Sequence, residues 1–181
     1  MEMDNPVILK GPKVWLTNNL EEKYAEEMAR MANDKEIYRN LGAHTFPSPY
    51  RKEDAINFFT MNRKDGKNYF TMDFLIFAGD KLAGVIGLKD INYIDRNAHI
   101  GYWIGREHRN KGFASEAVSL LSSFCREELK LVMIYTGVLD YNLASVKVLM
   151  KNGFSVDGFR KKAFLMDDGF HSFFYLSRIL D

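Results

Sequence analysis

IGYWIGREHRNKGFASEA, residues 100–117, is the most informative stretch of this chain. It predicts an apolar strand, then a basic turn containing glycine, then the start of an amphipathic helix. The first turn of a helix has unpaired backbone N–H groups and a partial positive charge, so residues 109–114 are predicted to cradle a pyrophosphate. Arg109 and Lys111 add full charges, while Gly112 permits close backbone approach and Ala114 keeps the first helical turn small. An ordinary strand-to-helix loop with solvated charges is the alternative, and the flanking sequence decides between the two.

Length and composition predict one globular domain spanning residues 1–181, because 46% of the residues are hydrophobic and 27% are charged. The formal net charge is only +1. Such a balance offers no general attraction for nucleic acid or an anionic membrane, so an anionic ligand must be held by local groups, and a small cofactor fits better than a polymer. The chain lacks an apolar run of roughly 18 residues and a signal-peptide core, so we expect a cytoplasmic protein.

Cysteine and histidine usage points away from disulfide and metal chemistry. The single cysteine, Cys125, lies on the apolar stripe of a predicted helix, where a small buried hydrophobe is expected rather than a nucleophile. No metal site is expected, because no paired ligand spacing links the four histidines, His44, His99, His108 and His171.

Apolar periodicity predicts the remaining elements. Those before residue 105 are a strand at 7–16 interrupted by Gly11 and Pro12, a helix from near Leu20, a loop at 40–50, a second helix ending near Gly66, and strands ending at Ala78, Tyr93 and Ile104. Those after the basic turn are a helix with Glu116, Arg126 and Glu127 facing outward, a strand at 131–139, a helix at 142–152 ended by Gly153, and a strand pair near 154–160 and 172–179.

This order of elements, together with two motifs, resembles the GNAT-superfamily N-acetyltransferases, and more narrowly the RimJ/RimL branch. The turn RNKGFA at 109–114 matches the acetyl-CoA motif R/Q-x-x-G-x-G/A, and it follows the strand AHIGYWI. Downstream, NLASVKVLMKNGF at 142–154 matches N-x-x-S-x-x-V-x-x-x-x-G-F. The resemblance implies an α+β fold in α/β/α layers, with a mixed, mostly antiparallel sheet of about seven strands flanked by about four helices.

The resemblance also implies acetyl-CoA as co-substrate and assigns residues to it. In the family, the strand before the turn leaves part of its backbone unpaired, and the pantetheine arm bonds to main-chain groups there. The matching positions are Trp103, Ile104 and Gly105, and the pyrophosphate then sits on Arg109, Asn110, Lys111, Gly112, Phe113 and Ala114. Asn142 matches the asparagine that bonds the pantetheine arm, although an asparagine there is equally a helix N-cap. For Trp103, the alternative is an aromatic residue of the sheet interior.

Two catalytic candidates follow from the same resemblance. Many family members carry a tyrosine at the position of Leu149, but the RimL-like pattern uses a serine, so Ser145 is the candidate general acid or thiolate stabiliser; a solvated helix serine is the alternative. His99 replaces a glutamate that acts as base through water. Strand alternation puts His99, Gly101 and Trp103 on one face, and an imidazole of pKa near 6.5 accepts protons at neutral pH. A structural histidine of the sheet is the alternative.

A second glutamate proposed as base in RimL aligns with Phe164, which leaves His99, Asp168 and His171 as nearby titratable groups. The acceptor amine is expected between the first two helices, the loop Ala43–Tyr50 and the hairpin near Asp167–Phe173. A weak base suits an α-amine of pKa about 7.8 better than a lysine-type amine of pKa about 10.4. We therefore expect a protein or peptide N-terminus as acceptor, with a small amine or a non-catalytic acetyl-CoA-binding module as alternatives, and the family also allows a homodimer.

Overall fold

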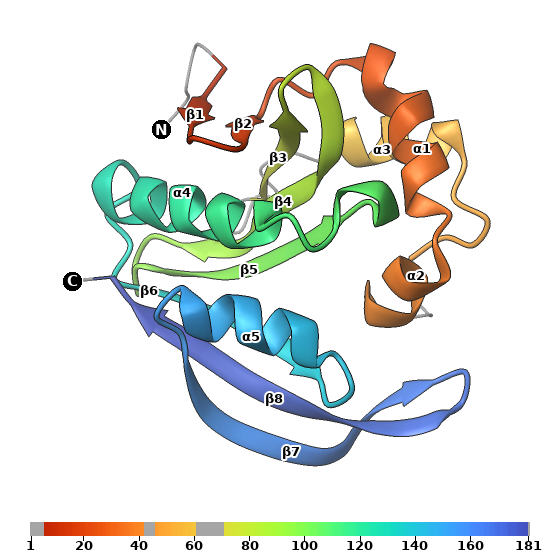
Figure 1. Ribbon diagram of the computed structural model, residues 1–181. Coiled ribbons are helices and arrows are strands. Elements are labelled where there is room, and N and C mark those ends of the chain that lie inside the picture. Colours follow the sequence, from red (N-terminus) through yellow and green to blue (C-terminus); the bar gives the residue numbers. More distant parts are fainter. Residues whose placement is uncertain (1–5, 42–45, 61–70, 181) are drawn as a thin grey trace.

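The computed structural model describes residues 6–41, 46–60 and 71–180. In these ranges one sheet of eight strands runs in the order β1-β2-β3-β4-β5-β6-β8-β7 (Figure 1). All neighbouring strands pair antiparallel except β5 and β6, which are parallel. The predicted mixed, mostly antiparallel sheet is confirmed, and the described part has eight strands and five α-helices where about seven and about four were expected.

The strands are β1 (Ile8–Lys10), β2 (Trp15–Thr17), β3 (Met72–Ala78), β4 (Lys81–Asn92), β5 (Asn97–Ile104), β6 (Met133–Leu139), β7 (Ser155–Met166) and β8 (Gly169–Ile179). The helices are α1 (Ala25–Ala32), α2 (Lys35–Leu41), α3 (Lys52–Thr60), α4 (Phe113–Glu127) and α5 (Leu143–Lys151), with short 3-10 turns η1 (Glu22–Tyr24) and η2 (Arg106–His108). None of the helices in the described ranges has both the length and the apolar character needed to cross a bilayer.

Helices cover both faces of the sheet, because both sets of alternating positions in the central strands are apolar. Helices α4 and α5 lie on one face (Figure 1). Ile86 of β4 and Ile100 of β5 pack there against Val118 of α4. The opposite face packs on α1 and α3, where Val85 and Trp103 belong to one buried cluster with Met28, Leu75 and Ala55. The α/β/α layering is therefore as predicted.

The parallel ladder between β5 and β6 is short. It pairs Asn97 with Met133, Ala98 with Ile134 and His99 with Tyr135. Beyond the third pair, residues 100–104 of β5 stay paired with β4 alone, and β6 continues beside β8. Half of β5 thus presents main-chain groups along an edge that has no ladder partner among the described strands.

Two predictions about local structure were wrong. Helix α2 extends to Leu41 and was not predicted, so the expected loop at 40–50 begins later, and its residues 42–45 lie outside the described residues. Glu116 does not face outward: its Oε1 accepts hydrogen bonds from the backbone N–H groups of Lys13 at 2.7 Å and Val14 at 3.0 Å. The turn between β1 and β2 packs on α4 there, a contact that no local pattern indicates. The expected end of the second helix near Gly66 also lies outside the described residues.

Candidate active site

The connection from β5 to α4 forms a turn lined with backbone amides. Asn110 at φ +61° and Gly112 at φ +81° both adopt left-handed conformations, and Gly112 is the N-cap of α4 without a side-chain cap bond. The first bond of the helix runs from the N–H of Glu116 to the carbonyl of Gly112 at 3.1 Å. The N–H groups of residues 113–115 consequently have no intrahelical acceptor, and together with the left-handed turn they form the concave set of donors that binds anions.

The Arg109 side chain has a different position from the one expected. Its guanidinium lies 2.7 Å from Asp34 and 2.5 Å from Glu36, and its Nε donates to the carbonyl of Ile104 at 3.2 Å. Two carboxylates at the start of α2 therefore already balance the charge that was expected to face the pyrophosphate. Arg109 fixes α2 against the end of β5, and only its backbone is left in the amide turn.

Asp34 immediately precedes the first residue of α2. Its Oδ1 accepts from the amides of Glu36 at 2.9 Å and Ile37 at 3.0 Å, as an N-cap does. Burial opposes ionisation of the carboxyl, but Arg109 and the two amides outweigh it and lower the pKa of Asp34 below its ordinary value. Asp34 thus stays ionised at neutral pH, where it both caps α2 and forms an ion pair with Arg109.

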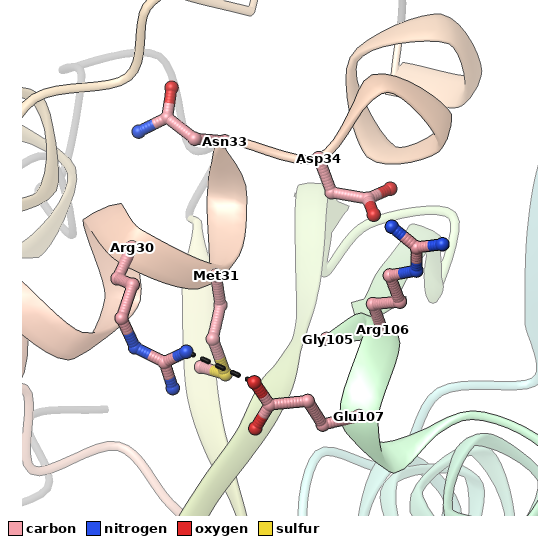
Figure 2. Close-up of a pocket in the computed structure, with 7 residues that line it drawn as sticks. All are labelled: Arg30, Met31, Asn33, Asp34, Gly105, Arg106 and Glu107. Carbon is pink, nitrogen blue, oxygen red and sulfur yellow. Dashed lines mark hydrogen bonds and ion pairs between the residues drawn. The ribbon is translucent and has the colours of Figure 1, made fainter.

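A cavity of about 190 Å³ lies beside this contact, between the end of α1 and η2 (Figure 2). Arg30 and Met31 line one side and Gly105 and Glu107 the other, with Arg30 and Glu107 paired across it at 3.1 Å (Figure 2). Both side chains of this pair are more than half exposed, so the pair adds little stability. The cavity marks where the α1–α2 turn meets the outer end of β5.

Lys13 is a site residue that the sequence reasoning missed. It belongs to the β1–β2 turn held by Glu116, and its Nζ lies 3.2 Å from the place that a Cβ on Gly112 would occupy. A full positive charge therefore stands beside the amide turn, although Arg109 does not supply it. The sequence gives no signal for this, because Lys13 and Gly112 come together only through the packing of β1 and β2 on α4.

Asn142 and Ser145 lie where β6 passes into α5, on the opened side of β5. Asn142 is the N-cap of α5, and its Oδ1 accepts from the N–H of Ser145 at 3.2 Å, so the N-cap alternative is observed. The Ser145 hydroxyl lies 2.9 Å from the hydroxyl of Tyr102, which belongs to the half of β5 that pairs with β4 alone. Ser145 is half-buried rather than a solvated helix serine, and Leu149 is buried.

Tyr102 was not predicted as a site residue. Burial raises the pKa of Tyr102 to about 12, partly offset by its bond with Ser145. The phenol is therefore protonated at neutral pH, and it is able to donate to Ser145. The tyrosine of the strand motif IGYWI carried no functional signal on its own, since an aromatic residue in a buried strand is ordinarily core.

His99 shares a sheet face with Gly101 and Trp103, as predicted. Trp103 is an interior aromatic on the α1 and α3 side, which was its alternative reading. His99 forms the last ladder pair with Tyr135, and their rings meet edge to face at 5.7 Å. Burial and the charge of Lys89 lower the pKa of His99, against a smaller opposing effect of Asp90. Its ring is therefore neutral at pH 7.

The other titratable candidates belong to a network that joins the β7–β8 hairpin to α2. His171 Nε2 lies 2.7 Å from Asp168, and Asp168 lies 3.2 Å from Arg39 of α2. The Tyr141 hydroxyl donates to the carbonyl of Arg39 at 2.6 Å. Asp168 and His171 thus hold α2 and the hairpin together, and Phe164 packs on Phe173 with ring centres 5.3 Å apart.

Burial also determines the protonation state of the Cys125 thiol. Cys125 lies on α4 in the main core cluster, and burial raises the pKa of its thiol to about 12. A thiol in that environment stays protonated and packs as a small hydrophobe. The prediction that Cys125 is a buried hydrophobe is confirmed.

A sheet that opens beside a glycine-containing helix start is the arrangement expected of an acetyltransferase fold. The chain belongs to the family described as Acetyltransferase (GNAT) domain, which matches residues 16–155. The family predicted from the motifs is thereby confirmed.

Relatives differ in what they are named for. A ribosomal-protein-serine acetyltransferase of Escherichia coli K12 is 31% identical over 108 residues, which is 60% of this chain and 60% of that protein's own length. A spermidine N(1)-acetyltransferase of Vibrio cholerae is 28% identical over 130 residues, 71% of this chain and 74% of that one. A solved structure of RimL, the ribosomal L7/L12 alpha-N-protein acetyltransferase, in complex with coenzyme A has a TM-score of 0.85 at 20% identity, covering 97% of this chain and 99% of that chain. This structural likeness concerns the fold.

Proposed function

We propose that this chain is an acetyl-CoA-dependent N-acetyltransferase that acetylates a primary amine, most directly the α-amine of a protein or peptide. The observation that carries the proposal is the opened half of β5, which leads along one edge into the amide turn before α4. An extended thioester carrier fits such an edge, because its amides pair with a strand while its diphosphate takes the helix start.

Acetyl-CoA is assigned to the opened half of β5 and to the amide turn before α4. The pantetheine arm lies along the main chain of Trp103, Ile104 and Gly105, and Asn142 donates to it from its amide nitrogen while its Oδ1 caps α5. The diphosphate sits on the amides from Asn110 to Ala114, and the backbone of Arg109 opens this turn. Lys111 and Lys13 supply the positive charge.

The reaction is a direct attack within a ternary complex. The neutral amine forms a C–N bond to the acetyl carbonyl carbon, the C–S bond breaks, and the electron pair leaves on sulfur. Ser145 stands at the opening to stabilise or protonate that thiolate, with the Tyr102 hydroxyl behind it at 2.9 Å. His99, on the opposite face of β5, is the first candidate for the proton acceptor, because its ring is neutral and able to take a proton.

Proton affinity favours an α-amine as acceptor. Removing a proton at pH 7.4 costs about 0.5 kcal/mol from a group of pKa about 7.8, but roughly 4 kcal/mol from one of pKa about 10.4. A weak side-chain base is therefore sufficient for an α-amine but not for a lysine-type amine. The naming of the Escherichia coli relative agrees with this choice, while the match to the Vibrio cholerae protein over 71% of this chain makes spermidine the second candidate.

A thiol-release assay with acetyl-CoA tests the proposal against a serine-initiated peptide, an alanine-initiated peptide and spermidine. We expect turnover with at least one peptide, and a kcat at least tenfold lower in Ser145→Ala with the Kd for acetyl-CoA kept within twofold by calorimetry. Ser119→Ala on α4 is the matched control. Binding of acetyl-CoA without turnover of any amine would instead favour a binding module, and absence of binding would contradict the proposal entirely.

A further inference from the structure

A row of three residues crosses the sheet on the face that packs against α1 and α3. Asp73 of β3 pairs with Gly87 of β4, and Gly87 pairs with Gly101 of β5. The row beside it is Leu75, Val85 and Trp103, all buried in the cluster with α1 and α3, which fixes the face. Because its other two members are glycines, this row itself places no side chain between Asp73 and the opened edge of β5.

The carboxyl group of Asp73 lies over the strand next to its own. A Cβ built on Gly87 would overlap Asp73 Oδ1, so the carboxyl group occupies the space that a side chain at 87 would take. Neighbouring strands are about 4.8 Å apart, so the carboxyl stands roughly one strand spacing from the backbone of Gly101. Gly101 is exposed, and a Cβ built on it would meet no atom of the described residues within 4 Å. The Asp73 carboxyl group, which lies over Gly87, is therefore next to the position at Gly101 that no described residue fills.

We propose that Asp73 binds the ammonium group of the acceptor over Gly101 and takes its proton before the attack on the thioester. The proposal rests on the function proposed above, because it uses the thioester placed along the opened half of β5. The acceptor ammonium gives one proton to the Asp73 carboxylate, which becomes a carboxylic acid. The neutral nitrogen then forms the C–N bond, the C–S bond breaks, and a second nitrogen proton goes to sulfur through the Ser145 and Tyr102 hydroxyls.

The environment of Asp73 suits a proton acceptor that works near neutral pH. The residue is only 4% exposed, and burial raises the pKa of its carboxyl to about 7, with Lys89 of β4 acting in the opposite direction. Tyr50 is close enough for charge interaction, because the Asp73 charge, after burial and the charge of Asp54, contributes to the raised pKa of that phenol. His99 lies in the row beyond Gly101, paired with Lys89. A base near pH 7 matches an α-amine more closely than His99, whose pKa is lowered.

Asp73→Asn tests the inference, with Asp157→Asn on β7 as the charge-loss control. We expect kcat/KM at pH 7 for a serine-initiated peptide to fall at least 100-fold in Asp73→Asn, and the acidic limb of its pH profile, with an apparent pKa near 7, to disappear. The Kd for acetyl-CoA should stay within twofold. Asn removes a buried charge without changing shape, so the Tm of this variant at pH 8 should be no lower than that of the parent.

Gly101→Val gives a second measurement that does not alter Asp73. No described residue obstructs a side chain at position 101, and a valine there covers the place assigned to the ammonium. The KM for the peptide should rise at least tenfold with the Kd for acetyl-CoA unchanged. Gly158→Val, at another glycine whose Cβ would meet nothing within 4 Å, should leave both constants as they are.

Three results would overturn the inference. The first is Asp73→Asn with kcat/KM within threefold of the parent. The second is a parallel loss of acetyl-CoA affinity in that variant, which would make Asp73 structural. The third is an acidic limb that persists in Asp73→Asn and vanishes in His99→Gln. A parent protein that binds no acetyl-CoA would overturn the proposed function as well, and that failure is distinguished because it is seen before any substitution is made.

Discussion

The hydroxyl groups of Tyr102 and Ser145 are the two groups proposed to stabilise or protonate the departing thiolate. The phenol has a pKa of about 12, so it holds its proton and donates rather than ionises. The Tyr102→Phe variant removes one hydrogen bond of about 1 to 1.5 kcal/mol, which corresponds to roughly tenfold in kcat. We expect that loss with the acetyl-CoA Kd unchanged, measured by thiol release. Tyr24→Phe, outside the site, is the control, and equal kcat in the two variants would remove Tyr102 from the mechanism.

Lys13 is the side chain proposed to place a positive charge beside the diphosphate on the amide turn. Because its Nζ lies beside Gly112, Lys13→Ala should weaken coenzyme A binding about fivefold, equivalent to about 1 kcal/mol for an exposed charge pair. Calorimetry at low and high salt checks this, since the difference from the parent should shrink as salt rises. Lys10→Ala, on the neighbouring β1, is the matched control. Identical affinities for the two variants would show that Lys13 does not reach the diphosphate.

At the scale of the element, α2 connects the two sides of the site. Its start is tied to the end of β5 through Asp34 and Arg109, and its end meets the β7–β8 hairpin, where the Tyr38 hydroxyl lies 3.2 Å from Asp167. Seven residues with one buried side chain, Ile37, would be marginal as an isolated helix. The tertiary contacts at its two ends therefore stabilise it.

Asp34→Ala should lower the free energy of unfolding by about 2 kcal/mol, since it removes the N-cap and one of the two carboxylates on a mostly buried guanidinium. Glu36→Ala, which removes the exposed carboxylate only, should cost less than about 1 kcal/mol. The folded-state pKa of Asp34 is lowered, so its stabilisation is present above about pH 4 and is lost as the pH falls through the folded value. Urea unfolding at pH 7 and pH 3 measures both effects, and equal costs for the two variants would contradict the capping role.

At the scale of the whole molecule, the sequence predicted what local chemistry determines. The alternation at His99, Gly101 and Trp103 follows from periodicity and was found as predicted, and the helix cap at Asn142, which residue type offered as the alternative to a cofactor contact, is also observed. What was missed depends on segments far apart in the chain. Glu116 with Lys13, and Arg109 with Asp34, meet only after the sheet and α4 have packed.

The register of the sheet is the second such case. Asp73 faces Gly101 across Gly87 because three strands align, and no window of sequence contains that row. The short ladder of β5 with β6 is likewise a property of the assembled sheet, on the face that α4 and α5 cover (Figure 1). The family motifs indicated where the cofactor binds, but not which side chains surround the acceptor.

The central claim is that acetyl-CoA lies along the opened half of β5 with its diphosphate on the turn before α4. Backbone amide chemical shifts recorded during a titration with coenzyme A test it directly. We expect the largest changes on residues 102–105 and 110–115, and we expect them to saturate with the Kd found by calorimetry. Saturable binding with both segments unmoved would contradict it.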